Sequence, residues 1–214
     1  MRSTILYPIC LFGLLLINAC GGEADILPCV DGEGPVVSQN FNVSAFSGLT
    51  LAISANVTIT QGDEQSVSIM GQQNILDALA LSVSNSNCTI EFNGPGCFNY
   101  NELTIEITVP DMNQLELVSS GIITLNDFED QDDLDLRISG SGNINLNSYS
   151  GAANLEAEIS GSGNIIAFKT IMLSNTATVT VSGSGTYQGF NIIADNYIVT
   201  LSGSGNIELT ANDA

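Results

Sequence analysis

Residues 139–144 read Ser-Gly-Ser-Gly-Asn-Ile, and the second half of the chain returns to this stretch repeatedly. Residues 160–165 and 202–207 repeat it letter for letter, residues 182–187 read SGSGTY, and residues 117–121 read LVSSG. The last glycines of successive copies are 21, 21, 22 and 20 residues apart. These glycines are Gly121, Gly142, Gly163, Gly185 and Gly205. Such a steady period predicts a repeat protein in which each copy stacks on the next.

Apolar and polar residues alternate on both sides of each glycine stretch. Leu134, Leu136 and Ile138 precede one stretch, Ile144 and Leu146 follow it, and polar residues lie between them. An alternation with period two is typical of strands with one buried and one wet face, whereas a helix needs apolar residues every three or four positions. We therefore expect each repeat, or rung, to be a strand, a glycine corner, a second strand and a return segment.

The glycine corners decide how the rungs stack. Glycine turns the chain sharply without a Cβ clash. A lone rung buries too little apolar surface to offset the entropy of ordering its backbone, so rungs must share their strand hydrogen bonds. Stacked rungs make parallel strands, and parallel crossovers are overwhelmingly right-handed. The predicted fold class is all-β: a right-handed parallel β-helix with rungs of about 21 residues and one short helix in the N-terminal half. The expected corner glycines are Gly121, Gly140, Gly142, Gly161, Gly163, Gly183, Gly185, Gly203 and Gly205.

The N-terminus has the pattern of an export signal. Arg2 precedes an apolar run over 5–17 that is too short to cross a bilayer. Ala19 before Cys20 resembles a bacterial lipobox, which implies cleavage after residue 19 and a lipid on the Cys20 sulfur. We expect residues 1–19 to be a lipoprotein signal peptide and residues 20–35 an acidic, glycine-rich tether.

The charge balance excludes whole classes of partner. Removal of residues 1–19 removes Arg2 and leaves Arg137 and Lys169 against 23 acidic residues, a net charge of 2 − 23 = −21. This surface repels the phosphates of nucleic acid and of anionic lipid, so nucleic acid is excluded as a partner. The sequence calls for no cofactor.

Three cysteines remain besides Cys20, in an exported chain where disulfides form. They allow three single pairings. Cys88 and Cys97 could close a short hairpin, or Cys29 and Cys97 could fasten the N-terminal segment. The chain has no histidine and no Cys-x-x-Cys motif, which argues against a structural zinc site.

The folded part is expected to be a single domain over residues 36–214. Its residues 36–110 would form degenerate rungs, with Ser54-Ala55-Asn56 in a corner position, and its residues 111–210 the regular SGSG rungs. Residues 74–82 (NILDALALS) have helical spacing, which predicts the short helix there.

At this point the sequence resembles a known family. The segments CVDGEGPVVSQ, FSGLTLAISANVTITQGDEQSVSIMGQQNILDAL and LTIEITVP, followed by serial ISGSGNI rungs, are similar to the head GIN domain family of auto-transporter adhesins. The resemblance covers roughly residues 29–209. It implies an exported β-helical protein, often a lipoprotein, without an established activity. It also implies a Cys29–Cys97 disulfide with Cys88 free. The family often has Asp where this chain has Asn143, Asn164 and Asn206, which argues against a cation ladder at the corners.

The densest acidic segment is the return loop between two rungs. Calcium takes six to eight oxygen ligands, but the spacing here is not that of an EF-hand. A solvated acidic loop is the stronger interpretation, and a calcium site the weaker one. The acids are Asp127, Glu129, Asp130, Asp132, Asp133 and Asp135.

The remaining alternatives concern function. A carbohydrate-active β-helix enzyme, a polysaccharide lyase or hydrolase, is disfavoured because only two basic residues remain and no histidine exists. Glu156 and Glu158 share a strand face, which a solvated surface explains better than a carboxylate pair. We therefore expect no catalytic residues and a non-catalytic, adhesin-like binding or structural domain.

The expected location is the cell envelope. The lipid on Cys20 would attach the chain to the membrane, and Gly21 in place of an aspartate favours the outer membrane, facing either the periplasm or the surface. The expected ligand is a protein or a glycan of the envelope or surface. Few residues follow Leu209 to cover the last rung, which predicts weak end-to-end self-association.

Overall fold

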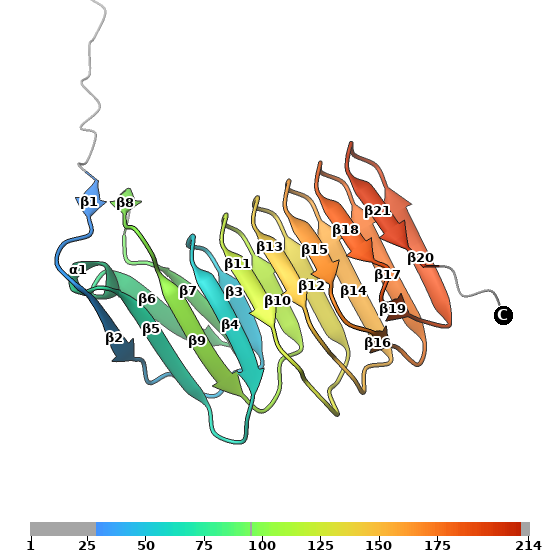
Figure 1. The fold of residues 1–214 in the computed structure, drawn as a ribbon, viewed down its shortest axis with the longest axis horizontal. Helices are drawn as coiled ribbons and strands as arrows, with labels where there is room; N and C mark the ends of the chain where they lie inside the picture. Colours follow the sequence, from blue (N-terminus) through green and yellow to red (C-terminus); the bar gives the residue numbers. More distant parts are fainter. Residues whose placement is uncertain (1–28, 95, 211–214) are drawn as a thin grey trace, which may run out of the picture.

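The computed structural model describes residues 29–94 and 96–210 of this 214-residue chain. The expected signal peptide, Cys20 and the first part of the expected tether lie outside the described residues. The described chain is almost entirely β-structure, arranged as a row of stacked strand pairs (Figure 1).

Two large sheets run along the length of the molecule. The eight-stranded sheet has, in spatial order, β20 (Asn196–Leu201), β17 (Thr176–Val181), β14 (Asn154–Ile159), β12 (Leu134–Ile138), β10 (Gln114–Leu117), β3 (Gly48–Leu51), β7 (Asn87–Phe92) and β6 (Leu79–Ser84). The nine-stranded sheet has β2 (Val36–Asn40), β5 (Ser66–Gln72), β9 (Thr104–Val109), β4 (Asn56–Gln61), β11 (Ile122–Leu125), β13 (Asn143–Leu146), β15 (Asn164–Ala167), β18 (Thr186–Gly189) and β21 (Asn206–Leu209). Two small parallel pairs join β1 (Val30–Asp31) to β8 (Phe98–Asn99) and β16 (Ile171–Met172) to β19 (Ile192–Ile193).

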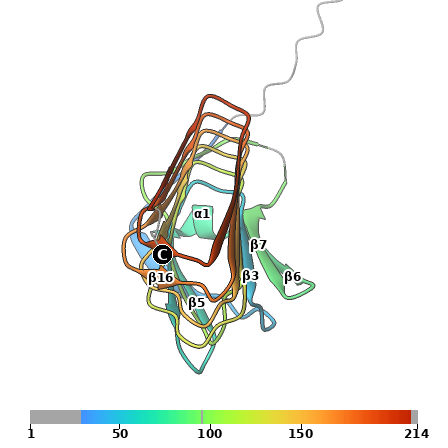
Figure 2. The same cartoon turned by 90° about the vertical axis from the view of Figure 1, so that its right-hand side faces the viewer.

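The regular rungs stack in register, as their spacing predicts. Every strand from β10 onward in the two large sheets pairs in parallel with a strand of an adjacent rung, and Asn143 faces Asn164, which faces Thr186. The corners lie over one another when the molecule is viewed along the stack (Figure 2). A Cβ on Gly163 would lie 2.0 Å from the carbonyl oxygen of Gly142, so only glycine fits this close approach.

The core is the space between the two sheets. The alternating apolar residues of each rung point into it, and their side chains are nearly all excluded from solvent. Because identical positions stack, Ile123, Ile144 and Ile165 form one buried column. Stacked apolar columns of this kind stabilise each rung only through its neighbours.

The N-terminal half follows a different path. After β3 and β4 the chain runs to the end of the stack through β5, a single helical turn α1 (Gln73–Leu76) and β6, and then returns as β7 and β9. The strands β7 and β9 pair in parallel with β3 and β4 on one side, and β10 and β11 pair with them on the other. The first rung in sequence is therefore enclosed between two later ones.

The end beyond β7 and β9 is closed by antiparallel strands. The strand β6 pairs antiparallel with β7, β5 with β9, and β2 with β5. Ile75 and Leu76 of α1 are buried there. Antiparallel partners break the stacking direction, so this end has a different surface from the strand edges of β20 and β21.

The predicted helix over residues 74–82 is largely wrong. Its helical part is only Gln73–Leu76, and Leu79–Ser84 is strand β6. Leu79, Leu81 and Val83 alternate with small or polar residues, and all six residues of β6 pair with β7. In so short a stretch the same apolar residues fit both helical and alternating spacing. The pairing with β7 decides for the strand.

The expected corner position at Ser54-Ala55-Asn56 is confirmed. Asn56 faces Ile122 on one side and Thr104 on the other, in the column that continues to Asn143. This rung turns without the SGSG sequence, and Ala55 is buried at its corner.

Candidate functional site

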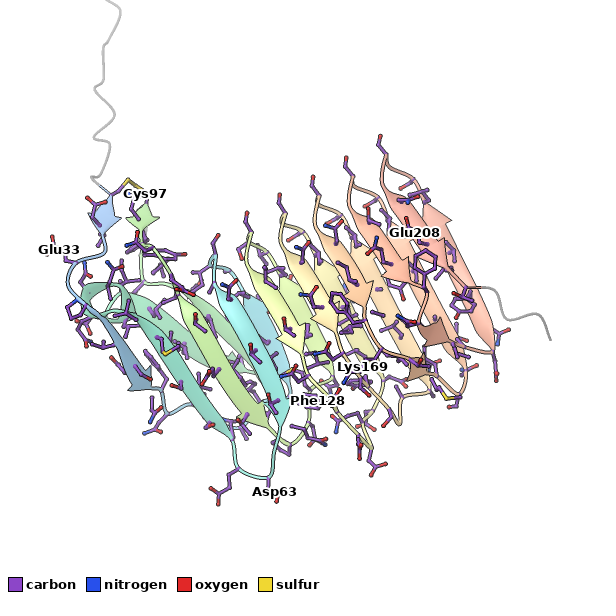
Figure 3. The ribbon with its side chains drawn as sticks, in the orientation of Figure 1. Glu33, Asp63, Cys97, Phe128, Lys169 and Glu208 are labelled. Atoms are coloured by element: carbon purple, nitrogen blue, oxygen red, sulfur yellow. A yellow bond between two sulfur atoms is a disulfide. The ribbon has the colours of Figure 1, made fainter. Side chains whose placement is uncertain are left out.

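A short arm projects at the disulfide end of the molecule, where β1 pairs in parallel with β8. A disulfide joins Cys29 to Cys97 at its tip, with the two Cα atoms 4.6 Å apart (Figure 3). The pairing that the family resemblance implied is thus confirmed. Among the cysteines that the structure describes, Cys88 is the free thiol; it is fully buried in β7, and burial raises its pKa to about 11.

Hydrogen bonds fix the arm against the helical turn. The Nδ2 of Asn74 donates to the carbonyl oxygen of Asp31 at 2.7 Å, and the amide of Glu33 donates to the Oδ1 of Asn74 at 2.9 Å. Within the arm, Asn99 Nδ2 donates to the Asp31 carboxylate at 2.8 Å. The arm is therefore a fixed wall and not a loose loop.

A notch lies between this arm and the neighbouring corners, with a volume of about 740 Å³. Drug-sized ligands occupy pockets of roughly 300–1,000 Å³, so the notch has the size of a ligand site. We call it the corner notch. It is lined by Asp31, Gly32, Ser54, Ala55, Asn56, Gln72, Phe98, Asn99, Tyr100, Asn101, Glu102, Leu103, Ser120, Gly121 and Ile122.

The notch arises because adjacent corners differ in length. The corners at residues 52–55 and 118–121 are tight, and a Cβ on Gly121 would lie 2.5 Å from the carbonyl oxygen of Ala55. The connection between β7 and β9 is the longer segment 93–103, which includes the arm. A long corner beside two short ones leaves a hollow at their junction.

Aromatic rings gather at the base of the arm. The rings of Phe92 and Phe98 stack with centroids 3.9 Å apart, and Tyr100 lies 5.6 Å from Phe92. The Tyr100 hydroxyl donates to the Ser54 carbonyl oxygen at 2.9 Å and so links the arm to the next corner. Partial burial raises the pKa of the Tyr100 hydroxyl, which stays protonated and able to donate.

One wall of the notch contains an unpaired polar group. Gln72 is 7% exposed, and its buried Oε1 accepts no hydrogen bond from any described residue. A Cβ on Gly32 would lie 2.1 Å from this oxygen, so the glycine is what leaves room for the amide. A buried acceptor without a donor costs about 1–3 kcal/mol, which makes it an unusual feature in a wall this well ordered.

The notch is acidic and contains no basic side chain. Asp31 and Glu102 are exposed at its rim. The two basic residues of the described chain lie elsewhere: Arg137 contacts Asp135 at 2.9 Å, and Lys169 contacts Asp127 at 2.8 Å. The notch therefore offers hydrogen bonds and negative charge, and its lining has no cationic side chain that could pair with an anion.

The acidic loop does not gather into a metal site. Among residues 29–94 and 96–210, no group of three or more His, Cys, Asp and Glu side chains is close enough to hold an ion. Asp127 binds Lys169 and Asp135 binds Arg137. Asp133 accepts hydrogen bonds from Ala153 and Asn154, and the bonds from Asn154 lower its pKa. The three other weak calcium candidates do not complete a site: Glu129, Asp130 and Asp132.

The other predicted residues fall in structural positions. The glycines of the regular corners stack on each other's backbone, and Gly121 alone also borders the notch. Glu156 and Glu158 lie on the outer face of β14 beside Arg137, at 3.9 and 3.5 Å. Cys20 lies outside the described residues. In the described part of the chain, no helix is long and apolar enough to span a membrane.

The notch was not predicted from the sequence because its walls come from five separate segments. Residues 31–32, 54–56, 72, 98–103 and 120–122 meet only after β3 and β4 are enclosed by later rungs. A usable signal existed in the clustering of Phe92, Phe98 and Tyr100 around Cys97. The disulfide implied by the resemblance placed that cluster beside the N-terminal arm.

Comparisons with known proteins agree with this architecture. A family model described as "Putative auto-transporter adhesin, head GIN domain" matches residues 45–214. No curated protein matches the chain.

Several solved structures share the fold. A putative lipid binding protein from Parabacteroides distasonis aligns with a TM-score of 0.63 at 17% identity, over 86% of this chain and 100% of that one. A putative adhesin from the same species gives 0.60 at 20% identity, over 85% and 84%. A putative adhesin from Bacteroides fragilis gives 0.58 at 18% identity, over 85% and 100%. At these identities the likeness concerns the fold alone.

Proposed function

The chain belongs to the putative auto-transporter adhesin, head GIN domain family, and from that premise we propose that it is a non-catalytic, adhesin-type binding module of the cell envelope. The observation that carries the proposal is the corner notch: a fixed hollow of ligand size, walled by amides, hydroxyls and aromatic rings. The ligand is a protein or a glycan of the envelope or surface.

The scaffold of the module is a right-handed parallel β-helix. Its support is the parallel pairing of strands about one rung apart in sequence, joined by crossovers of the kind that are right-handed in about 98% of cases. Such a stack is long and stiff, and it holds the notch at one end of a rod.

A binding role fits the notch better than a catalytic one. The chain has no histidine, and the two carboxylates at the rim, Asp31 and Glu102, are exposed to solvent. A glycosidase acid needs an apolar enclosure that keeps its proton near neutral pH, and neither residue has one. The alternative of a polysaccharide lyase or hydrolase is therefore the weaker proposal.

Attachment through Cys20 would place the module on the outer membrane. The lipobox-like sequence before Cys20 supports this, and the arm at residue 29 begins nine residues later, so the notch would lie close to the anchored end of the chain. Metabolic labelling with palmitate should mark the wild-type protein and leave Cys20→Ser unlabelled. An unlabelled wild type would contradict the anchor.

The edge at β20 supports weak self-association as a second property. Ile198, Val199 and Leu201 are 57%, 45% and 50% exposed, and no described strand pairs with the outer side of β20. Open strand edges pair readily with another chain. Light scattering should show dimers at high concentration that Val199→Lys removes, and a strict monomer would contradict the proposal.

The binding role is tested by blocking the notch. Cells displaying the full chain are applied to immobilised glycans, polysaccharides and matrix proteins. Ser120→Trp fills the notch, and Ser184→Trp makes the same change at the equivalent exposed corner position three rungs away. We expect wild type and Ser184→Trp to adhere to at least one surface and Ser120→Trp to lose about tenfold or more. Equal adhesion by all three, or by none, would overturn the proposal.

A further inference from the structure

The hydrogen-bonding groups of the notch point to a particular ligand chemistry. Amide side chains and hydroxyls dominate its polar lining. Each amide presents both donors and acceptors, and each hydroxyl presents one donor and two acceptor positions. A ligand rich in hydroxyl groups matches such a wall, because every hydroxyl is itself donor and acceptor. The groups are Asn56, Asn99, Asn101, Gln72, Ser54 and Ser120.

Aromatic rings add an apolar surface beside these polar groups. Phe98 and Tyr100 line the notch and are half-buried, and the stacking of Phe98 on Phe92 fixes its ring plane. Sugars have C–H-rich faces flanked by hydroxyls, so they pack on ring faces while their edges form hydrogen bonds. A wall of rings beside amides fits both parts of a sugar.

The negative charge of the notch restricts the class of ligand further. Asp31 and Glu102 border the notch, and Arg137 and Lys169 are engaged with acids on other surfaces. A carboxylate, sulfate or phosphate on the ligand would be repelled here and would find no cation. The ligand is therefore not a uronate, a sialylated glycan or a phosphorylated lipid headgroup.

The unpaired Gln72 amide is able to form a new hydrogen bond with a ligand. Its Oε1 is covered by Gly32 and forms no hydrogen bond, so no interaction of that oxygen is lost when the amide turns. The last torsion of glutamine is broad and soft. A rotation of the amide within the wall can present a polar atom to a bound hydroxyl and relieve the unpaired oxygen.

We propose that the corner notch binds a neutral, hydroxyl-rich saccharide, held by the amides of Asn99 and Gln72 and packed against Phe98 and Tyr100. This inference rests on the proposed binding function and deepens it by naming the ligand class. It assigns the amides to recognition, the rings to packing, and the acidic rim to the exclusion of anionic glycans.

The test measures binding of the full chain to three matched tetrasaccharides by isothermal titration calorimetry. Mannotetraose or cellotetraose is the neutral probe, tetragalacturonate the anionic probe and chitotetraose with free amines the cationic probe. We expect a neutral tetrasaccharide to bind at least about tenfold more tightly than the galacturonate. Glu102→Gln should leave neutral binding within about threefold, because this carboxylate excludes anions and does not hold the sugar.

Two further variants separate recognition from folding. Gln72→Met keeps the volume of the side chain and removes the amide. Because Oε1 has no partner, we expect an unchanged or raised melting temperature together with weaker binding of about threefold or more. Tyr100→Phe removes only the hydrogen bond to Ser54 and serves as the mild control for the ring, which Tyr100→Ala removes.

The outcomes distinguish failure of the saccharide inference from failure of the proposed binding function. If Ser120→Trp abolishes adhesion in the display assay but no neutral tetrasaccharide binds, the notch is a site and the saccharide inference is wrong. Preference for the free-amine probe, lost in Glu102→Gln, would show an amine site and also overturn it. If Ser120→Trp changes nothing, the proposed function itself fails. Neutral binding that is lost in Ser120→Trp and kept in Ser184→Trp supports both.

Discussion

Residues 111–210 and residues 29–110 are both built from short strands with alternating apolar residues, yet they produce different surfaces. In the regular region each rung meets a copy of itself, so asparagine faces asparagine and glycine stacks on glycine. In the N-terminal region the chain reverses, inserts β7 and β9 beside an earlier rung, and adds a disulfide-linked arm. The aromatic cluster, the unpaired Gln72 and most of the notch lining lie in that region, and residues 120–122 of the first regular rung complete the notch. Repetition produces a uniform rod, and the break in repetition produces a site.

The largest expected effect comes from breaking the regular region at a corner. Gly163→Ala places a Cβ 2.0 Å from the carbonyl oxygen of Gly142, a backbone atom that cannot move without moving its rung. We expect a loss of more than about 4 kcal/mol in unfolding free energy, or no folded protein. Gly96→Ala in the arm is the control, because its new Cβ would find only Phe98 Cε2 at 3.9 Å. Urea unfolding of both variants makes the comparison, and a mild effect at Gly163 would show that the corners can separate.

The second effect tests the N-terminal region through its disulfide. Cys29 and Cys97 are 68 residues apart in sequence, so their bond restricts a large loop of the unfolded chain. Cys29→Ser should lower the unfolding free energy by about 2–4 kcal/mol. A reducing agent should have the same effect on the wild type and none on the variant. Coincident urea curves for oxidised and reduced protein would sink this prediction.

The third effect is a pH dependence from the same region. Burial raises the pKa of the Cys88 thiol from 9.0 to about 11, so the unfolded chain loses this proton first as pH rises. The contribution of the protonated Cys88 thiol to the unfolding free energy is complete below pH 9. It is lost between pH 9 and 11, which lowers the unfolding free energy by up to about 2–3 kcal/mol. Cys88→Ala should flatten the fall in unfolding free energy over that window. The buried tyrosines Tyr149 and Tyr187 also have raised pKa values and leave a residual slope in both proteins.

The smallest effect distinguishes an inner rung from an edge. Asn164 donates to Asn143 Oδ1 at 2.8 Å and accepts from the Thr186 amide at 3.0 Å. Asn164→Ala should cost about 1 kcal/mol, because the Thr186 amide keeps only the Gly163 carbonyl oxygen at 3.3 Å as acceptor and Asn143 Oδ1 loses its donor. Asn206 occupies the same corner position on the last described rung, and its side chain hydrogen-bonds to Glu208 within its own strand, so Asn206→Ala should cost less than about 0.5 kcal/mol. Thermal unfolding of both variants makes the comparison. Equal losses of stability would mean that the asparagine hydrogen bonds contribute no more between two rungs than at the edge of the stack.

The sequence predicts the regular region well because each rung has a copy to align with. The 21-residue spacing sets which residues face each other, and Ile144 pairs with Ile165 as the alignment requires. The N-terminal region has no such internal reference. Residues 79–84 contain both a helical and an alternating pattern, and only the contact with β7 decides between them. The position of β3 and β4 between later strands likewise depends on chain reversal, which no local pattern encodes.

The site was less predictable than the fold for a related reason. The disulfide followed from the resemblance, but Gln72 and Ser120 are ordinary surface-type residues in the sequence and become notch walls only through the arm. The acidic loop drew attention by composition, yet its carboxylates are spread over separate partners such as Lys169, Arg137 and Asn154. Charge density along a chain does not report how side chains diverge in space.

The strands β3 and β4 lie between β7 and β9 on one side and β10 and β11 on the other. This arrangement also bears on the order in which the rungs fold. Every strand of the closed end and its two nearest rungs precedes residue 110 in the sequence, so a complete seed can form before the later rungs emerge from the synthesis or export machinery. Each later rung then has a finished template to dock on as it emerges. Folding would then propagate from the N-terminal region toward the C-terminus, one rung at a time. The SGSG rungs need no folding nucleus of their own.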